Sequence, residues 1–304
     1  MISQTINQTI IIMSSVLSLV GNTPLVELKA LNPNPNVTIY AKLEGQNPGG
    51  SVKDRAAYNM IKQAQERGDL KKGVKLIEAT SGNTGIALAM ISSLMGIDIE
   101  LVMPDNATIE RIKSMKAYGA TVTLTPQKES MEGARDYALS KVQQGGYFML
   151  NQFDNPDNYL AHYKTTGPEI WRDTDKKVTH FVSAMGTTGT IMGTSKFLKE
   201  QSETITIVGT QPAEGAKIPG IRRWPKAYLP KIFDDSRVDQ KIDISQENAT
   251  NMTRLLAKEE GIFAGMSSGG SAYAAIETAK KLESGVIVFI ICDRGDKYLS
   301  TSLF

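Results

Sequence analysis

From Val74 onward the chain alternates short apolar runs with longer amphipathic segments, and this alternation constrains the fold more than any other feature. The apolar runs include residues 76–79, 99–103, 121–124 and 286–291. A strand followed by a helix and then by another strand is typical of crossover units, which build a parallel sheet with helices on both faces. We therefore predict an α/β protein with two open twisted sheets flanked by helices.

Two lobes are expected because a segment rich in Asp, Asn and Pro, residues 151–158, divides the strand and helix units into two groups. The 304 residues also suffice for about two domains. The strand-like run 38–43 cannot be assigned to either sheet by pattern. Residues 1–13 contain no Lys or Arg and no clear cleavage pattern, so we expect a loose N-terminal extension rather than a secretory signal.

Composition narrows the class of partner. The 34 Lys and Arg residues nearly balance the 32 Asp and Glu residues, which disfavours a dedicated nucleic-acid binder. Cys292 is the single cysteine, so no internal disulfide is expected and the chain is interpreted as cytoplasmic. His162 and His180 lack the spacing of a helical metal pair, so no metal site is expected. The apolar run 286–291 is far shorter than the roughly 20 residues that span a membrane.

Four glycine-rich turns are placed where a strand gives way to a helix, at the edge of a parallel sheet where ligands bind. They cover residues 47–55, 80–85, 186–190 and 265–270. The turn 186–190 combines backbone N–H groups, hydroxyls and a helix start, which together suit a phosphate. It lacks the lysine of a Walker loop and the spacing of a dinucleotide fingerprint, although a tight turn with capping threonines remains an alternative.

Lys53 follows two glycines and a serine at the predicted start of a helix over 54–67. The helix N-terminus and the adjacent Arg55 are expected to disfavour the protonated amine, which makes Lys53 a candidate for Schiff-base chemistry. A solvated surface charge is the ordinary alternative for a lysine. A phosphate-binding turn without a nucleotide motif, together with such a lysine, favours pyridoxal phosphate as the cofactor.

In the same order along the chain, the four turns resemble the motifs of the cysteine synthases, or O-acetylserine sulfhydrylases. These are fold-type II, tryptophan-synthase-β-like pyridoxal phosphate enzymes. The resemblance runs from about Gly21 to Phe304, and residues 103–106, 219–225 and 292–296 are similar to the B-type branch of that family.

The resemblance implies a division into domains. A larger, cofactor-binding domain is expected over residues 14–45 and 158–304, and a smaller domain over residues 46–157. Within the smaller domain, residues 99–142 are expected to move when substrate binds.

The resemblance also implies cofactor-binding roles. Lys53 would bind pyridoxal phosphate covalently and later remove the Cα proton of the substrate, and Asn83 would hydrogen-bond the ring hydroxyl. Ser267 would face the pyridine nitrogen, where a neutral hydroxyl gives a weaker electron sink than an Asp and so favours elimination over transamination. The phosphate would be held by Gly186, Thr187, Thr188, Gly189 and Thr190.

Substrate-binding roles follow in the same way. The substrate carboxylate would be bound by Thr80, Ser81, Gly82 and Thr84, helped by Gln152. Arg222 or Arg223 would bind an anionic sulfur donor such as thiosulfate, although paired surface arginines are often only solvated charges. Cys292 would lie near the cofactor ring, and catalysis by its thiol is not expected, because neither histidine is near it in sequence.

The implied reaction is a pyridoxal phosphate-dependent β-replacement, the last step of cysteine biosynthesis, carried out by a homodimer. It makes L-cysteine from O-acetyl-L-serine and sulfide, and S-sulfocysteine from thiosulfate. A serine/threonine dehydratase or a cystathionine β-synthase on the same fold is the enzymatic alternative. A non-catalytic homologue that only binds a partner or metabolite is disfavoured by intact Lys53, Asn83 and Ser267.

Overall fold

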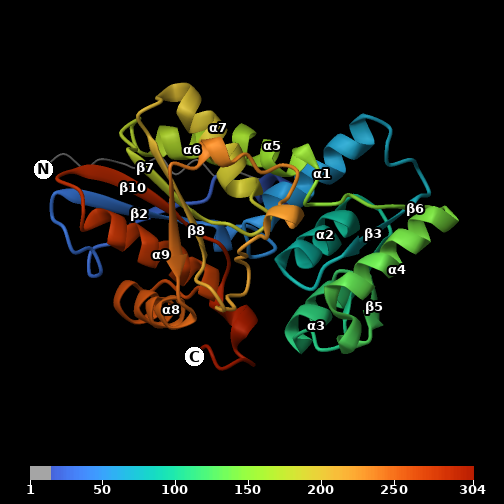
Figure 1. Cartoon of the computed structure of the whole chain (residues 1–304). Coiled ribbons are helices and arrows are strands. Elements are labelled where there is room, and N and C mark those ends of the chain that lie inside the picture. Colours follow the sequence, from blue (N-terminus) through green and yellow to red (C-terminus); the bar gives the residue numbers. More distant parts are fainter. Residues whose placement is uncertain (1–14) are drawn as a thin grey trace, which may run out of the picture.

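Two lobes, each built around its own sheet, form the computed structural model, which describes residues 15–304 (Figure 1). The extension predicted over 1–13 lies outside the described residues. The larger sheet has the strand order β1-β2-β10-β7-β8-β9, and the smaller sheet has the order β5-β4-β3-β6. Neighbouring strands are parallel except for β1, which pairs antiparallel with β2. The predicted α/β fold with two sheets is confirmed.

Each sheet is covered by helices on both faces. The strands are β1 (Leu25–Glu27), β2 (Val37–Leu43), β3 (Lys75–Ala79), β4 (Ile99–Pro104), β5 (Thr121–Thr125), β6 (Tyr147–Phe148), β7 (His180–Ala184), β8 (Thr206–Pro212), β9 (Gln240–Ile244) and β10 (Gly285–Ile291). The helices are α1 (Lys53–Glu66), α2 (Asn83–Leu94), α3 (Ile109–Ala117), α4 (Ser130–Gln144), α5 (Pro156–Lys164), α6 (Thr166–Asp173), α7 (Gly189–Gln201), α8 (Gln246–Glu260) and α9 (Met266–Ala279).

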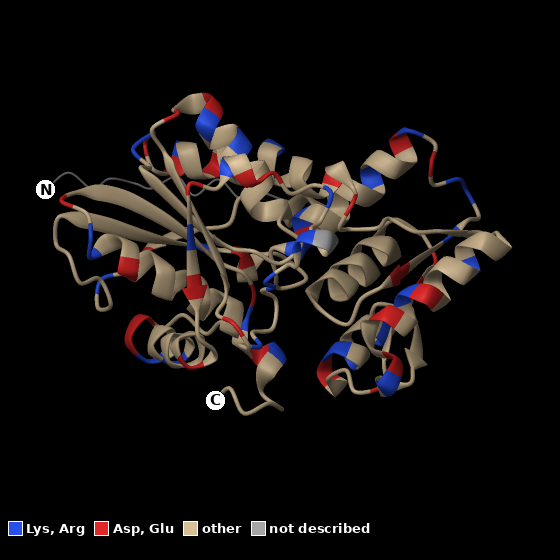
Figure 2. Cartoon of the chain, in the orientation of Figure 1, with Lys and Arg blue, Asp and Glu red and all other residues tan. Residues whose placement is uncertain are grey.

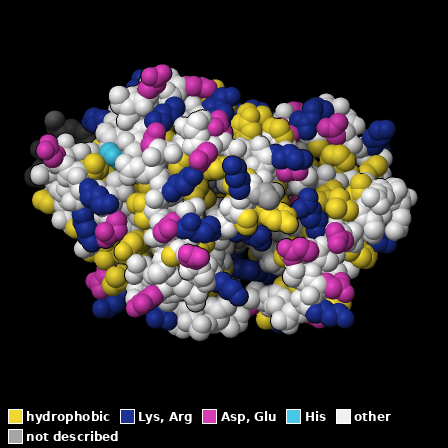
Figure 3. Space-filling view, viewed as in Figure 1, with side chains coloured by type: hydrophobic (Ala, Val, Ile, Leu, Met, Phe, Trp, Pro, Cys, Tyr) yellow, Lys and Arg dark blue, Asp and Glu magenta, His cyan; other side chains and the backbone are white. Residues whose placement is uncertain are grey.

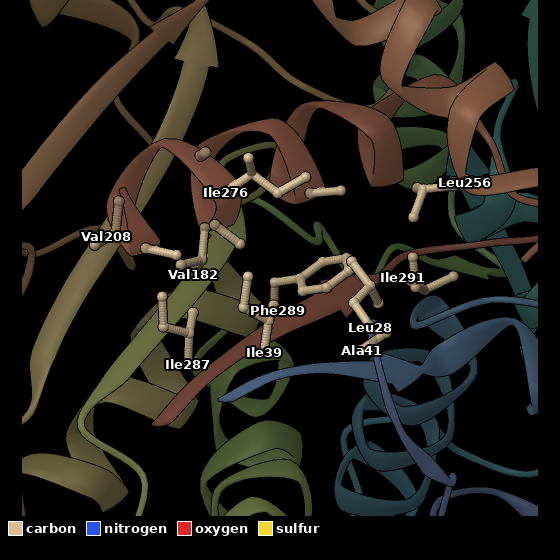
Figure 4. Packing of buried hydrophobic residues seen from close by; sticks show 14 of the residues in the cluster. Leu28, Ile39, Ala41, Val182, Val208, Leu256, Ile276, Ile287, Phe289 and Ile291 are labelled. Atoms are coloured by element: carbon tan, nitrogen blue, oxygen red, sulfur yellow. The ribbon is translucent and has the colours of Figure 1, made fainter. Parts of the chain in front are cut away.

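Strand β10 shows why its sequence is apolar throughout. Ile287, Phe289 and Ile291 pack in the core on the side of α8 and α9, while Val288 and Ile290 pack in the core with α6 and α7 on the opposite side (Figure 4). Side chains alternate between the faces of a strand, so a strand covered on both faces is apolar at every position. The predicted strand that could not be assigned to a sheet is β2, which pairs with β10 along its whole length.

The smaller lobe follows the same rule. Leu76 and Leu101 pack with α1 and α2, whereas Ile77 and Val102 pack with α4 on the other face. Helix α1 also packs against α5 of the larger lobe. It therefore joins the two lobes, and its first residue is Lys53.

Charged residues are found mostly on the helices and loops at the outside of the molecule (Figure 2). Four ionic residues at the start of α1 are buried instead. Arg55 pairs with Glu44 at 2.7 Å and with Glu169 at 2.6 Å, and Lys42 pairs with Glu169 at 2.8 Å. This network ties β2, α1 and α6 together and fixes the backbone two residues beyond Lys53. No helix within residues 15–304 is long and apolar enough to cross a membrane.

The prediction of a turn over 265–270 followed by a helix from Ser271 is wrong, because α9 begins at Met266. The glycines serve close packing instead of a turn. A Cβ on Gly269 would overlap Thr253 and the carbonyl oxygen of Ala249 on α8. Only glycine allows the two helices to approach this closely.

Helix α5 was missed because its start has the composition of a connecting loop. The side chain of Asn155 accepts a hydrogen bond from the N–H of Asp157 and caps the helix, and Pro156 occupies its first turn. Proline is favoured at that position because its missing N–H would have no partner there. The predicted connection over 151–158 therefore contains the first residues of a helix.

Candidate active site

Lys53 occupies the first position of α1, after the turn that follows β2. It is half-buried, and burial lowers the pKa of its amine against the opposing effect of Cys292 and Asp293. Burial is thus the largest cause of the shift. The expected role of Arg55 in this shift is wrong, because its guanidinium lies between Glu44 and Glu169 and is neutralised there. A lysine with a lowered pKa has the neutral amine that attack on a carbonyl requires.

The turn 186–190 leads from β7 into α7 and is shaped for a small anion. Thr188 caps α7 with a φ of +70°, and its hydroxyl is buried without a hydrogen-bond partner in the described structure. A Cβ on Gly189 would overlap Asn158, so only glycine allows the turn to pack this closely against that side chain. Free N–H groups at a helix start and an unpaired hydroxyl fit the phosphate of pyridoxal phosphate.

Ser267 lies in the first turn of α9 and is only 4% exposed. Its hydroxyl hydrogen-bonds the thiol of Cys292, but burial raises the pKa of that thiol to about 11. Cys292 therefore stays neutral at physiological pH and is a poor nucleophile. The hydroxyl of the next residue, Ser268, accepts a hydrogen bond from the N–H of Cys292 at 2.9 Å.

Asn83 begins α2, and its side chain meets residues of the larger lobe. Nδ2 donates to Oδ2 of Asp293 at 2.6 Å, and Oδ1 accepts from Nζ of Lys297 at 3.0 Å. The Tyr298 hydroxyl also donates to Oδ2 of Asp293 at 2.7 Å. Asp293 and Lys297 thus orient the amide, a role that was not predicted beyond the family resemblance of residues 292–296.

The turn 80–84 comes together with Gln152, as predicted. The Thr84 hydroxyl donates to Oε1 of Gln152 at 2.8 Å across the end of β3. The N–H of Gly82 donates to the Thr80 hydroxyl at 3.5 Å. The start of α2 and the amide of Gln152 therefore share one space, which suits a carboxylate.

Asn158 connects this substrate turn to the phosphate turn. Its Nδ2 donates to the carbonyl oxygen of Gln152 at 2.7 Å and to the Thr187 hydroxyl at 3.2 Å. Asn158 was not predicted as a site residue, because it lies in the segment interpreted as a connection between lobes.

His162 lies behind the phosphate turn and is 1% exposed. Nδ1 is 2.9 Å from the Thr166 hydroxyl and Nε2 is 3.4 Å from the Thr190 hydroxyl. Burial lowers the pKa of His162 to about 3, so the ring is neutral. From the sequence, His162 was considered only as a metal ligand, and no metal site was expected there. Among residues 15–304, no group of three or more acidic, His or Cys side chains is arranged to hold a metal ion.

The two arginines predicted to bind the sulfur donor lie in different surroundings. Arg222 lines a pocket of about 290 Å³ together with Thr188 of the phosphate turn, and its guanidinium lies 5.2 Å from the ring centroid of Trp224. Arg223 instead donates to the carbonyl oxygen of Pro212 at 2.9 Å and pairs with Asp243 of β9. Of the two, Arg222 is the one next to the phosphate turn.

These groups gather where the two lobes meet, and the surface there is hollowed and edged by Lys and Arg side chains (Figure 3). A second pocket of about 220 Å³ is lined from both lobes, by Gly49 and Lys297 on one side and Ser114 and Tyr118 on the other. A buried amine, a phosphate-binding turn, a neutral serine and an oriented amide fit pyridoxal phosphate. When bound, this cofactor supplies the electron sink for carbanion chemistry.

The comparisons with known proteins agree with this geometry. The family model described as "Pyridoxal-phosphate dependent enzyme" matches residues 16–293. Cysteine synthase B of Salmonella typhimurium is 56% identical over 292 residues, which cover 96% of each chain. The chain belongs to the cysteine synthases of the pyridoxal-phosphate dependent enzyme family.

Solved structures of cysteine synthases and related enzymes share the fold. Cysteine synthase of Entamoeba histolytica superimposes with a TM-score of 0.92 at 40% identity, covering 96% of this chain and 91% of that one. O-ureido-L-serine synthase superimposes with a TM-score of 0.91 at 36% identity, covering 96% and 95%.

Proposed function

We propose that this cysteine synthase makes L-cysteine and acetate from O-acetyl-L-serine and sulfide, as the last step of cysteine biosynthesis. The observation that carries the proposal is the amine of Lys53, whose pKa burial lowers against the opposing effect of Asp293, the residue that accepts a hydrogen bond from Asn83. The 56% identity to a cysteine synthase B supports it.

Each residue has a defined task in this proposal. The amine of Lys53 would hold the cofactor, would accept the Cα proton of the substrate and would return it to Cα once the sulfur has added. The turn 80–84 and the Gln152 amide bind the substrate carboxylate. The C–O bond at Cβ breaks to release acetate, and hydrosulfide forms the new C–S bond.

The serine at position 267 limits side reactions. Its hydroxyl is neutral, so it does not hold a proton on the pyridine nitrogen as an Asp would. This setting favours elimination from Cβ over transamination. Acetate loss and sulfur addition are therefore the preferred outcome.

Thiosulfate is proposed as a second sulfur donor, giving S-sulfocysteine. Arg222 supports this proposal, because its guanidinium faces a pocket that also contains Lys226 and Lys241. Asp235 is the single acidic residue of that lining, and it pairs with Lys241. The net positive charge of this lining attracts a dianion such as thiosulfate more strongly than it attracts the singly charged hydrosulfide.

The assembly and movements of the enzyme are also proposals. We propose a larger domain over 14–45 and 158–304 and a smaller domain over 46–157, whose residues 99–142 close on the substrate. Contacts of α3 with the larger lobe support the closing movement, because Arg111 lies 5.4 Å from the ring centroid of Tyr298. A cytoplasmic homodimer is the proposed working form.

Visible absorption tests the function directly. Protein loaded with pyridoxal phosphate should absorb in the visible region, shift its band when O-acetylserine is added, and return to the first spectrum when sulfide is added and cysteine forms. The variant Lys53→Ala should lose the band shift and about 10²–10⁴ of the turnover. Lys62→Ala, on the exposed side of α1, should keep both. A loaded protein whose spectrum shifts with O-ureidoserine or O-phosphoserine but not with O-acetylserine would contradict the proposed substrate.

A further inference from the structure

A buried carboxylate on β3 has no catalytic task in the function above. Glu78 is 3% exposed. Its Oε2 accepts a hydrogen bond from the N–H of Asn151 at 3.1 Å, and its Oε1 accepts one from the N–H of Gln152 at 3.4 Å. Both of its oxygens are therefore used by the segment that crosses between the lobes.

The reason lies in the strand ladder. Strand β3 pairs with β6 only through Lys75↔Tyr147 and Leu76↔Phe148. Beyond Phe148 the chain turns away towards the larger lobe, and the N–H groups of the crossing segment lose their strand partner. Buried N–H groups must be paired, and the Glu78 carboxylate supplies the acceptor in place of the backbone.

The backbone that Glu78 holds has an unusual conformation. Asn151 has a φ of +53°, which directs consecutive N–H groups towards one point. The N–H groups of Leu150, Asn151 and Gln152 all favour the ionised form of Glu78, whereas burial raises its pKa to about 7. Of the charged side chains on the packed helix α4, Arg135 is the one whose field reaches Glu78 and lowers its pKa.

The segment whose N–H groups donate to Glu78 ends at Gln152, in the proposed substrate site. Oε1 of Gln152 accepts from the Thr84 hydroxyl at 2.8 Å, so the amide is fixed with its oxygen towards α2. Its NH₂ group is then the end left to donate to a carboxylate. The orientation of Gln152 depends on where its backbone stands, and Glu78 sets that position.

We propose that Glu78 is a positioning residue for the substrate, which fixes the backbone of residues 150–152 and so aims Gln152 at the carboxylate bound by the turn 80–84. This inference rests on the proposed role of Gln152. Glu78 touches neither substrate nor cofactor in this role. It acts on substrate binding and leaves the chemistry at Lys53 unchanged.

The test is the variant Glu78→Gln with the matched control Glu100→Gln. Glu100 is an equally buried carboxyl on the neighbouring strand β4, 5% exposed, but it accepts from Thr123 and Tyr147 away from the cleft. An amide at position 78 turns an N–H towards a backbone N–H, so one bond is lost. The KM for O-acetylserine should rise about 10-fold, the factor for one charge-assisted hydrogen bond. The kcat, the KM for sulfide and the visible spectrum of the loaded enzyme should stay as in the wild type.

A double-mutant cycle separates the possible failures. Gln152→Ala should raise the KM for O-acetylserine, and adding Glu78→Gln to it should raise the KM no further, because both act through one contact. Additive effects, or equal effects of Glu78→Gln and Glu100→Gln, would overturn the inference while leaving the proposed function intact. If Gln152→Ala leaves the KM for O-acetylserine unchanged, Gln152 does not bind the substrate, and the inference about Glu78 is then wrong. If Glu78→Gln does not fold, Glu78→Asp takes its place, since the shorter side chain cannot reach both N–H groups.

Discussion

The side-chain amide of Asn83 donates a hydrogen bond of 2.6 Å to Oδ2 of Asp293, and this bond crosses from the first turn of α2 to the end of β10. Asp293 is fully buried, and its Oδ1 has no partner in the described structure. Lys297 holds the other end of the amide at 3.0 Å. The atoms of Asn83 are thereby assigned, and one N–H of Nδ2 remains for the hydrogen bond that we propose to the ring hydroxyl of the cofactor.

Replacing Asp293→Asn should loosen the cofactor. The substitution removes the charge that receives the Asn83 amide, and a bond of this kind contributes about 1.5–3 kcal/mol. We expect the affinity for pyridoxal phosphate to fall at least about 10-fold and the visible band of the bound cofactor to shift. The control Asp296→Asn, at an exposed position paired with Arg294, should retain the wild-type values. Equal retention of cofactor by both variants in reconstitution of the apoprotein would contradict the prediction.

Arg222→Ala and Arg223→Ala should differ with thiosulfate. Arg222 lines the pocket beside Thr188, whereas Arg223 is held by Pro212 and Asp243. We expect Arg222→Ala to raise the KM for thiosulfate about 10-fold, the effect of one charged hydrogen bond, with little change for sulfide. Arg223→Ala serves as the matched control. Steady-state kinetics with both donors decide the matter, and parallel changes for the two donors would count against a role in donor selection.

The variant Arg55→Met should lose stability. Arg55 is 2% exposed and lies between Glu44 and Glu169, so its removal leaves the buried Glu44 without its ion-pair partner and leaves Glu169 paired with Lys42 alone. Breaking a buried ion pair from one side costs about 3–5 kcal/mol of the free energy of unfolding. The exposed pair of Lys280 with Glu277 supplies the comparison, and Lys280→Ala should cost less than about 1 kcal/mol. Urea unfolding of both variants measures the difference, and similar losses would refute it.

His162 should make stability depend on pH. Burial lowers its pKa from 6.5 to about 3, so between these values the unfolded chain binds a proton that the folded chain does not. Folding is therefore less favourable as the pH falls from about 6.5 towards 3. In His162→Gln the free energy of unfolding should fall less between pH 7 and pH 5 than in the wild type. His180→Gln, at a half-buried position, should alter this slope less, and identical slopes in all three proteins would disprove the assignment.

Much of the fold was predictable because hydrophobic periodicity reports burial directly. The strands at 99–104 and 121–125 differ from prediction by one residue at their ends. The wrong predictions concern glycine and proline, which are typical of turns but also have roles in helices. Gly269 has the composition of a turn but permits close packing of α8 and α9, and Pro156 marks a helix start as readily as a loop.

The residues of the candidate site likewise include some that could be predicted from the sequence and some that could not. Lys53, Asn83, Ser267 and the turn 186–190 could be picked out in the sequence, because each lies in a short motif at a strand end. Asn158 and Glu78 could not, since they act on residues 29 and 73 or more positions away through single hydrogen bonds.

The sequence by itself determined the class of fold and the alternation of strands and helices, and it predicted a set of residues for the cofactor and the substrate, because these follow from periodicity and from local turn chemistry. Only the tertiary structure decided which charges matter. It neutralised Arg55 between two glutamates, turned Arg223 outward to Asp243, left Arg222 at the pocket and placed Glu78 beneath Gln152. The physical reason is that the effect of a charge depends on its burial and on its partners, and both are set by chain segments far apart in sequence.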